Sequence, residues 1–420
     1  MLPRNTARTI VIALAIMILT WGTIPMGSHG SAEAMADPAA LPQFPRMMWG
    51  SQGSAEGQFN YANAIAIDQL GNLYVSDEGN KRVQKFDGEG NFLSMWGWGV
   101  LNGTDAFQIC TRGCQAGKIG VGIGQFTLPT GVATDASNNI YVVDFNLDRI
   151  QKFGSAGNYL GVIGSSGTAA GQFDGVIGAA VGPAGKLYVA DSYSNRVHRF
   201  DGSGNFERLW GWGVQDGAPS FQSCTTGCQA GSSGTGNGQF DGLADVAVDS
   251  SGNVYVTEQY NHRVQKFNSN GAFLAKFGSL GSGDGQLSTP VGIWVDSSDH
   301  VYVVDQDNHR VQEFDSSGDF LRAFGWGVRD GASAFQVCTS GCQQGVIGVG
   351  AGQFDGIVDV VGDSSTDLYT VEGTNHRVQN LGAVLETFVG DNTHALGART
   401  QLLVDAPSVA LRAQLAGSSR

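Results

Sequence analysis

Six cysteines, which carry the most reactive side chains of this chain, stand in three closely similar motifs. Each motif has the form Phe-Gln-x-Cys-Thr-x-Gly-Cys, and its first cysteine lies 114 residues after that of the motif before it (224 − 110 and 338 − 224). The pairs are Cys110 and Cys114, Cys224 and Cys228, and Cys338 and Cys342. Three residues between partners favour a disulfide within each motif, worth roughly 2 kcal/mol for so small a loop. A thiolate metal site is the alternative, although the usual Cys-x2-Cys spacing is absent.

Three histidines share an Asn-His-Arg-Val motif and suggest a zinc triad. They are His262, His309 and His376. The same repeat position holds Lys81, Asp148 and Asn195 elsewhere in the chain, which favours a structural role in a loop over metal ligation.

An arginine and an acid also recur at one interval. The arginines are Arg82, Arg149, Arg196, Arg263, Arg310 and Arg377; the acids are Asp77, Asp144, Asp191, Glu258, Asp305 and Glu372. They suggest either an anion site or a structural ion pair. Six symmetric copies favour the structural pair, because a catalytic set rarely repeats with the fold.

Carboxylates that break the symmetry are more informative. Asp245 and Asp359 share one repeat position, whereas the equivalent residue 114 positions before Asp245 is Gly131. Further carboxylates stand nearby at Asp174, Asp241 and Asp355. Hard cations such as Ca²⁺ take several oxygen ligands of this kind, so we hypothesise a cation site at Asp245 and Asp359. The alternative is that these are turn residues bonded to their own backbone.

The elements that position these residues are short strands. A Gly-Gln-Phe or Gly-Gln-Leu triplet recurs with its glutamine at 58, 125, 172, 239, 286 and 353, in steps of 67, 47, 67, 47 and 67. After each triplet come four apolar or alternating runs, seen in one copy at 245–249, 254–258, 263–267 and 273–278. Runs of four to six β-branched and aromatic residues between Gly, Asn, Asp and Ser are typical of strands. Each unit is therefore predicted to be a four-stranded antiparallel meander.

Six such units predict an all-β chain folded as a six-bladed β-propeller, built as three copies of a two-blade unit. The pattern of Gly-Asn, Tyr-Val-x-Asp, Asn-His-Arg-Val-Gln-x-Phe and Phe-x-Phe-Gly resembles the NHL repeat of bacterial and animal proteins. The resemblance covers roughly residues 46–390 and implies the propeller fold. It implies little about function, since this scaffold hosts lyases, sensor domains and RNA-binding modules. The zinc lyases of the superfamily have Pro-His before inner strands, where this chain has Pro129-Thr130 and Pro290-Val291.

Two sets of loops are expected on one face of the propeller. The loops between second and third strands differ from blade to blade, and their side chains include Glu78, Phe145, Tyr193, Tyr260 and Gln306. We expect these residues to set binding specificity. The three 20-residue insertions that carry the cysteines follow the fourth strands, so we expect them to form a crown around the channel mouth. Their repeated Trp and Phe residues either stack on a ligand or, as we favour, pack each insertion onto its blade.

The N-terminus resembles a secretory signal. Arg4 and Arg8 precede an apolar stretch from Ile10 to Trp21, and Ala32-Glu33-Ala34 offers a cleavage site. A cleaved signal peptide at 1–34, a linker at 35–45, the propeller at 46–390 and a tail at 391–420 are predicted, with an uncleaved membrane anchor as the alternative. We therefore expect a secreted or extracytoplasmic protein with no membrane insertion after cleavage.

The net charge of the chain limits the classes of partner that we expect. The chain has 24 Lys and Arg against 38 Asp and Glu, a net charge of −14. Such a surface repels a phosphate backbone, so nucleic acid is not an expected partner. We expect a monomeric binding module that presents its loop-decorated face to a protein, peptide or glycan ligand. The alternative is a metal-assisted lyase or lactonase that uses carboxylates at the channel mouth.

Two segments compete to close the ring. Residues 47–50 resemble the end of a fourth strand, and residues 384–390 resemble another. Either the N-terminal segment closes the last blade or it adds an outer strand.

Overall fold

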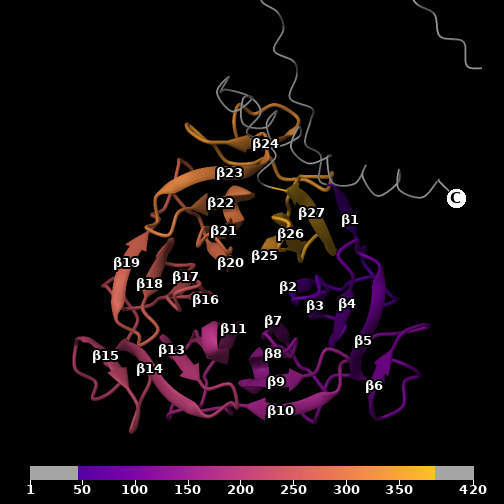
Figure 1. Ribbon diagram of the computed structural model, residues 1–420, viewed down its shortest axis with the longest axis horizontal. Helices are drawn as coiled ribbons and strands as arrows, with labels where there is room; N and C mark the ends of the chain where they lie inside the picture. Colours follow the sequence, from indigo (N-terminus) through magenta and orange to yellow (C-terminus); the bar gives the residue numbers. More distant parts are fainter. Residues whose placement is uncertain (1–45, 384–420) are drawn as a thin grey trace, which may run out of the picture. The chain divides into compact units, whose positions relative to one another are not determined.

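The computed structural model describes residues 46–383, which form a closed ring of six β-sheets (Figure 1). The predicted signal peptide at 1–34, the linker at 35–45, the strand-like segment at 384–390 and the tail at 391–420 lie outside the described residues. Each sheet is a blade whose first strand faces the central channel and whose later strands follow outward in chain order, except that β1 is the outer strand of the last blade (Figure 1). The predicted all-β, six-bladed β-propeller is confirmed.

The strands have the same order in every blade. The first strands are β2 (Ala62–Ile67), β7 (Pro129–Thr134), β11 (Val176–Val181), β16 (Leu243–Val248), β20 (Pro290–Val295) and β25 (Ile357–Gly362). The second strands are β3 (Leu73–Asp77), β8 (Ile140–Asp144), β12 (Leu187–Asp191), β17 (Val254–Glu258), β21 (Val301–Asp305) and β26 (Asp367–Glu372). The third strands are β4 (Arg82–Phe86), β9 (Arg149–Phe153), β13 (Arg196–Phe200), β18 (Arg263–Phe267), β22 (Arg310–Phe314) and β27 (Arg377–Ala383). The fourth strands are β5 (Phe92–Trp98), β10 (Tyr159–Ile163), β14 (Phe206–Trp212), β19 (Phe273–Phe277), β23 (Phe320–Trp326) and β1 (Met47–Trp49).

Turn chemistry joins the first two strands of a blade. In the fourth blade, Asp249 Oδ1 accepts hydrogen bonds from the backbone N–H groups of Ser251 (3.0 Å) and Asn253 (2.7 Å). The Tyr255 hydroxyl donates to the other carboxylate oxygen at 3.3 Å. In this turn the side chain of Asp249 accepts the hydrogen bonds of backbone N–H groups in the loop. The turn thereby fixes the register of β16 against β17.

Aromatic residues fill the space between neighbouring blades. Phe267 of the fourth blade lies 5.5 Å from Phe240 of its own blade and 6.0 Å from Trp210 of the third, measured between ring centroids. These residues belong to one buried cluster that spans the two blades. Since each blade buries its apolar face only against the next, the ring must close to complete the core.

The N-terminal strand closes the ring. β1 pairs antiparallel with β27, with Met47 opposite Asn380 and Trp49 opposite Val378, so the last blade combines both ends of the described chain. The Trp49 ring packs 5.9 Å from Phe86 of the first blade. Of the two arrangements left open by the sequence, the first is therefore observed: this segment is the fourth strand of the last blade.

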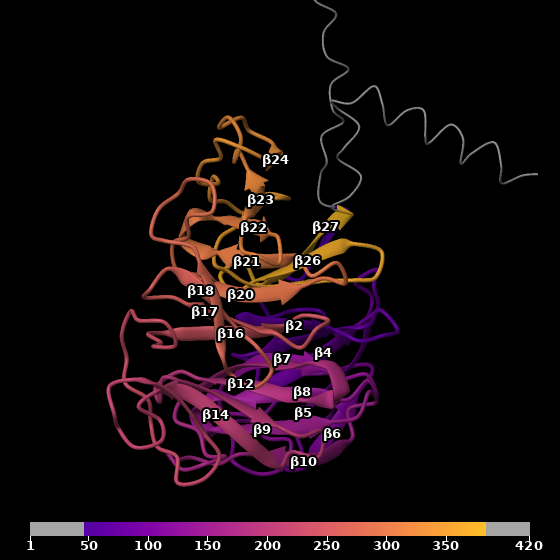
Figure 2. The same ribbon diagram turned by 60° about the vertical axis from the view of Figure 1, so that its left-hand side comes forward.

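The insertions add a fifth strand to alternate blades. β6 (Phe107–Cys110), β15 (Phe221–Cys224) and β24 (Phe335–Cys338) pair with β5, β14 and β23 and lie at the outer rim of the ring (Figures 1 and 2). The expected crown around the channel mouth is therefore wrong. The fourth strand of a blade has a free hydrogen-bonding edge. The insertion forms a strand that pairs with this edge, and it therefore lies at the rim and not over the channel.

Within residues 46–383, three short helical turns connect consecutive strands. η1 (Phe145–Leu147) and η3 (Gln306–Asn308) lie between second and third strands, and η2 (Pro183–Gly185) lies between β11 and β12. No helix in the described part of the chain is long and apolar enough to span a bilayer.

Candidate functional site

The cysteines form three local disulfides. Cys110 bonds to Cys114, Cys224 to Cys228 and Cys338 to Cys342, as the spacing predicts. Each bridge closes its own insertion at the rim. None of the six cysteines lines the cavity in the channel that is described below.

The phenylalanines of the insertions pack against neighbouring aromatic residues. Phe107 stacks on Phe153 of the next blade with ring centroids 5.9 Å apart, and Phe221 stacks on Phe267 at 5.8 Å. The favoured interpretation as packing residues therefore fits the structure. The packing is against the following blade, because the insertion leads directly into the crossing between blades.

The recurring arginine–acid pairs are structural. In the first blade Arg82 Nε donates to Asp77 Oδ2 at 2.8 Å, and both side chains are fully buried. The Arg82 guanidinium also donates to the carbonyls of Ala55 (2.9 Å) and Gln58 (2.7 Å). Equivalent acid–arginine contacts occur in all six blades. The pair therefore binds the Gly-Gln-Phe loop to the second strand, which is a structural role.

Two histidines of the Asn-His-Arg-Val motif form hydrogen bonds to the neighbouring blade. His376 Nδ1 accepts a hydrogen bond from the N–H of Tyr61 at 2.9 Å, and His262 Nδ1 accepts one from Thr289 at 3.2 Å. Both histidines, like His309, adopt a positive φ near 50°. The histidines are loop residues, and the described chain contains no group of three or more His, Cys, Asp and Glu side chains that could hold a metal ion.

One face of the ring carries the variable loops, and we call it the mouth face. It consists of the loops between second and third strands at residues 78–81, 145–148, 192–195, 259–262, 306–309 and 373–376. The first strands begin at this face, because the end of each second strand pairs with the start of the first.

Tyr193 and Tyr260 are the most exposed of the predicted binding residues. Their exposed fractions are 66% and 69%. Each ring lies over the glycine that precedes a first strand, Gly175 or Gly242, where a Cβ atom would come within 2.7 or 2.6 Å of the ring. The tyrosines therefore lie on the mouth face, each beside the start of a first strand.

The other three predicted binding residues have neighbours on the mouth face. Phe145 contacts Tyr193 edge to face, with 5.5 Å between ring centroids. Glu78 accepts a hydrogen bond from Asn63 Nδ2 at 2.6 Å, and Gln306 Nε2 donates to the Ile357 carbonyl at 2.9 Å. Gln306 lines the channel, whereas Phe145 and Glu78 do not.

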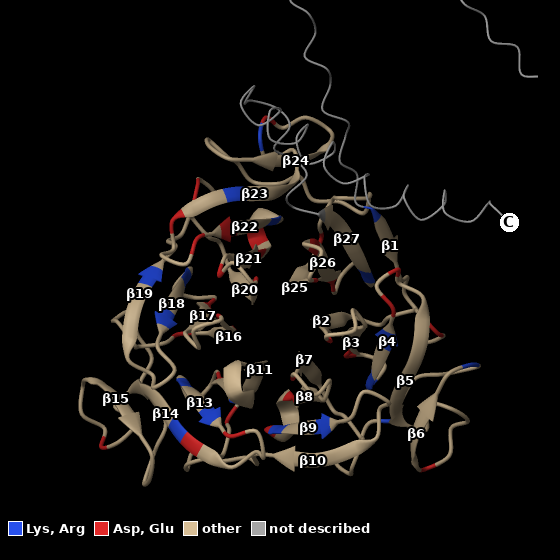
Figure 3. Ribbon diagram, in the orientation of Figure 1, with Lys and Arg blue, Asp and Glu red and all other residues tan. Residues whose placement is uncertain are grey.

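The channel contains a cavity of about 480 Å³. Its wall is formed by the first strands and is made mainly of alanine, valine and isoleucine side chains. Of the residues that line it, only Asp245 and Asp359 are charged. The Lys and Arg residues of β9, β18 and β19 lie away from the channel (Figure 3).

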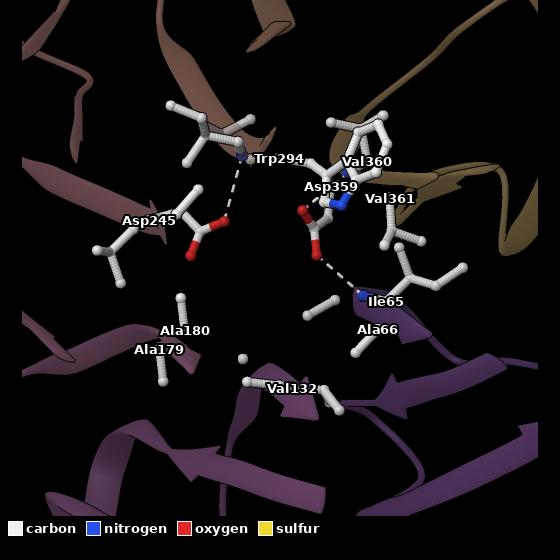
Figure 4. A pocket seen from close by; sticks show the side chains of 18 of the residues that line it. Ile65, Ala66, Val132, Ala179, Ala180, Asp245, Trp294, Asp359, Val360 and Val361 are labelled. Atoms are coloured by element: carbon white, nitrogen blue, oxygen red, sulfur yellow. Dashed lines mark hydrogen bonds between the residues drawn. The ribbon is translucent and has the colours of Figure 1, made fainter. Parts of the chain in front are cut away.

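Asp245 and Asp359 face one another across this cavity (Figure 4). Asp359 Oδ1 accepts a hydrogen bond from the N–H of Val360 at 2.8 Å, and its Oδ2 accepts one from Ile65 at 2.9 Å. Asp245 Oδ2 accepts one from Ile293 at 3.2 Å. Each carboxyl group therefore joins the first strand of its own blade to that of the next blade in the ring.

Both carboxyl groups have raised pKa values. Burial in the channel raises the pKa of Asp359 to about 7. Burial also raises the pKa of Asp245, and the charge of Asp359 raises it further. Two carboxyl groups in one apolar cavity cannot both ionise without a large electrostatic cost, so the pair holds a proton near neutral pH.

The structure brings together Asp245 and Asp359 but not the other predicted carboxylates. Asp174, Asp241 and Asp355 do not line the cavity. The backbone N–H of each instead bonds to the buried acid of the second strand in its own blade. The Ca²⁺ hypothesis for the two channel acids stays a prediction.

Several lining residues were not predicted. Tyr61, Asn63 and Gln259 line the mouth end of the cavity, and Trp294 lines its wall. Trp294 occupies the position held by Ala66, Ala133, Ala180 and Ala247 in other blades. Comparing first strands position by position would have revealed this single aromatic residue.

Comparison with known proteins places four blades in one repeat family. The NHL repeat matches residues 59–86, 173–200, 240–267 and 287–314, which run from the Gly-Gln-Phe or Gly-Gln-Leu triplet to the end of the third strand. Protein lin-41 of Caenorhabditis elegans is 42% identical over 50 residues, and protein brain tumor of Drosophila melanogaster is 50% identical over 46. These matches cover 12% and 11% of this chain and 4% of each relative.

A solved structure has the same fold. It is a structural genomics protein of unknown function from Bacteroides thetaiotaomicron, 15% identical, with a TM-score of 0.51; the alignment covers 79% of this chain and 74% of that one. At this identity the likeness concerns the fold alone. Residues 46–383 are therefore a six-bladed β-propeller with NHL repeats.

Proposed function

We propose that this propeller is a secreted binding module that presents its mouth face to a protein or peptide. The observation that carries the proposal is the pair of exposed rings, Tyr193 and Tyr260, on the face where the first strands begin, together with a cavity lined by those strands that contains two carboxyl groups. Tyrosine gives a large contact area at a small cost in side-chain entropy, and it is enriched in binding surfaces.

The charge of the mouth face favours a basic partner. Its loops carry three acids, Glu78, Asp148 and the exposed Asp307, against one lysine, Lys81. A negative surface speeds and orients the approach of a positively charged partner. For this reason we favour a basic protein or peptide over a neutral glycan.

The three disulfides support a secreted location. Disulfides persist in oxidising compartments and are rare in the cytosol. Together with the signal-like residues 1–34, they are the basis for proposing that the protein acts outside the cytoplasm.

Selection of ligands tests the proposed face. A displayed peptide library is selected on the full chain, and the selected peptides are then titrated against a Tyr193→Ala, Tyr260→Ala double variant. We expect at least about a tenfold loss of affinity, because aromatic anchors contribute most of the energy of an interface.

A matched control uses the rim of the ring. Leu160 and Leu274 are exposed apolar residues of β10 and β19. Substituting both with Ala removes similar exposed apolar groups away from the mouth. Peptides that lose affinity for this rim variant and keep it for the tyrosine variant would contradict the proposal, as would a selection that yields no binding peptide.

A further inference from the structure

The cavity in the channel has two carboxyl groups in an otherwise uncharged wall. Apart from Asp245 and Asp359, its lining residues are apolar or carry neutral polar groups such as Asn63, Gln259 and Gln306, which stand near the mouth. Its volume of about 480 Å³ is within the usual range for small-molecule sites.

The two carboxyl groups have a limited number of free lone pairs. Each oxygen of Asp359 already accepts one backbone hydrogen bond, and so does Oδ2 of Asp245. Those oxygens keep about one acceptor site each. Ca²⁺ requires six to eight oxygen ligands, whereas an ammonium group donates three directed hydrogen bonds. The arrangement therefore suits an ammonium group better than a hard metal ion.

Electrostatics favour the same ligand. The carboxyl groups face one another across the lumen, and the ionisation of either is opposed by its burial. A single positive charge between them would interact favourably with both and remove the repulsion.

Trp294 provides an independent indication. Its indole extends from β20 over Gly362 of the next blade, where an added Cβ atom would lie 2.3 Å from indole Cη2. Four other blades have alanine at this position, so the indole adds an aromatic surface to a wall that is otherwise made of small aliphatic groups. Indole rings attract cations, and an aromatic wall with carboxylates is a common way to recognise amines.

We propose that the channel binds a ligand through a protonated primary amine seated between Asp245 and Asp359, with the indole of Trp294 in the wall beside the ammonium group. This inference deepens the proposed binding function, on which it rests, by naming the group that enters the mouth. A lysine side chain of a peptide and a free alkylamine share this chemistry.

Calorimetric titration of the full chain tests the inference at pH 6.5. The probes are butylamine, Nα-acetyl-lysine amide and a lysine-containing peptide, and the matched neutral probes are butanol and Nα-acetyl-norleucine amide. We expect the amines to bind and the neutral probes to bind at least about tenfold more weakly, because hydrogen bonds to charged groups are the stronger ones. Binding of the peptide and not butylamine would identify a lysine side chain as the source.

Proton release gives a second signal. An ammonium group that displaces the shared proton releases it to the buffer, so the measured heat should differ between phosphate and MOPS, neither of which is a primary amine, in proportion to their ionisation heats. The affinity for amines should also fall as the pH is lowered from 7.5 to 5.5.

Substitution of the two channel acids tests whether butylamine binds between them. Asp245→Asn and Asp359→Asn keep the size of the side chain and are each expected to weaken butylamine binding at least about tenfold. Asp319→Asn, in an exposed turn, is the control and should leave it unchanged. Circular dichroism and the unfolding midpoint show that each variant is folded.

The outcomes separate this inference from the proposed function. Equal binding of butanol and butylamine, Ca²⁺ binding without amine binding, or no amine heat in any buffer would overturn the amine site. Loss of peptide binding in the Tyr193 and Tyr260 double variant with intact butylamine binding would support both. Peptide and butylamine binding that both survive in Asp245→Asn would leave the mouth face as the binding surface and remove the channel amine site.

Discussion

His198 Nε2 lies 3.2 Å from Asp191 Oδ2 in the interior of the third blade, and both side chains are fully buried. The other five blades have glutamine at the position of His198, namely Gln84, Gln151, Gln265, Gln312 and Gln379. In the first blade the glutamine amide accepts from the N–H of Gly57 (3.0 Å) and donates to the carbonyl of Gln58 (2.7 Å). Nδ1 of His198, in contrast, is buried and has no hydrogen-bond partner among the described residues.

His198→Gln is expected to stabilise the protein. The glutamine would restore the hydrogen bonds seen in the other blades and remove an unsatisfied buried nitrogen, which is worth about 1 to 2 kcal/mol. Urea denaturation measures the change in the free energy of unfolding. The reverse substitution Gln265→His, in the fourth blade, should lower it by a similar amount, and an unchanged stability in both variants would show that the imidazole is accommodated without cost.

The stability of the third blade should depend on pH through the same histidine. Burial lowers the pKa of His198, the Asp191 carboxylate opposes this effect, and the nearby Arg196 adds to it. Because the unfolded chain then binds a proton more readily than the folded one, stability is complete above about pH 6.5 and is lost as the pH falls below that value. The difference in unfolding free energy between wild type and His198→Gln, measured from pH 7.5 to 5.0, isolates this contribution and should widen on acidification.

The channel carboxyl groups should give the opposite dependence. Their raised pKa values mean that the folded state holds a proton that the unfolded state releases, so stability is lost as the pH rises through about 7. Asp245→Asn removes the repulsion with Asp359 while its amide oxygen can still accept from Ile293. We expect this variant to exceed wild type in unfolding free energy by more at pH 8 than at pH 5, because the wild type loses stability between about pH 4, the ordinary pKa of Asp, and about pH 7. A parallel shift at both pH values, or the same gain in Asp319→Asn, would contradict this account.

Trp49 should be important for closing the ring. Its ring packs against Phe86 of the first blade and lies 6.4 Å from Tyr369 of the last. Trp49→Ala is expected to cost about 3 kcal/mol, as large-to-small substitutions of packed aromatic residues do. Its exposed neighbour Met48 is the control, and Met48→Ala should cost less than about 1 kcal/mol. If thermal and urea unfolding show similar losses of unfolding free energy for the two variants, the Trp49 ring does not stabilise the closure of the ring of blades.

The disulfides should matter little to the ring itself. Each one closes a loop with only three residues between its cysteines, so the chain-entropy gain is about 2 kcal/mol. A Cys224→Ser, Cys228→Ser double variant should keep the circular dichroism spectrum of the wild type and lose no more than about 3 kcal/mol, which includes the packing of the two buried sulfur atoms. Complete unfolding of this variant at 25 °C would show that the insertion supports the blade.

Features within one repeat were predictable from the sequence. The spacing of the Gly-Gln-Phe triplets and the alternating runs indicated six four-stranded units, and the arginine–acid pairs and disulfides followed from residues a few positions apart. The second and third strands in the expected copy, Val254–Glu258 and Arg263–Phe267, agree with the structure residue for residue. Such contacts are set by short turns and strand alternation, which depend on local sequence.

The sequence by itself therefore determined the blade, its number of copies and its internal bonds, whereas the tertiary structure decided what lies between blades. Asp245 and Asp359 are 114 residues apart, and only closure of the ring makes them face each other across the channel. The pairing of β1 with β27 and the position of the insertions at the rim likewise depend on which strand edges remain free after the ring has formed. These contacts join segments far apart in the chain, so no local pattern specifies them, and they form only when neighbouring blades bury their apolar faces together.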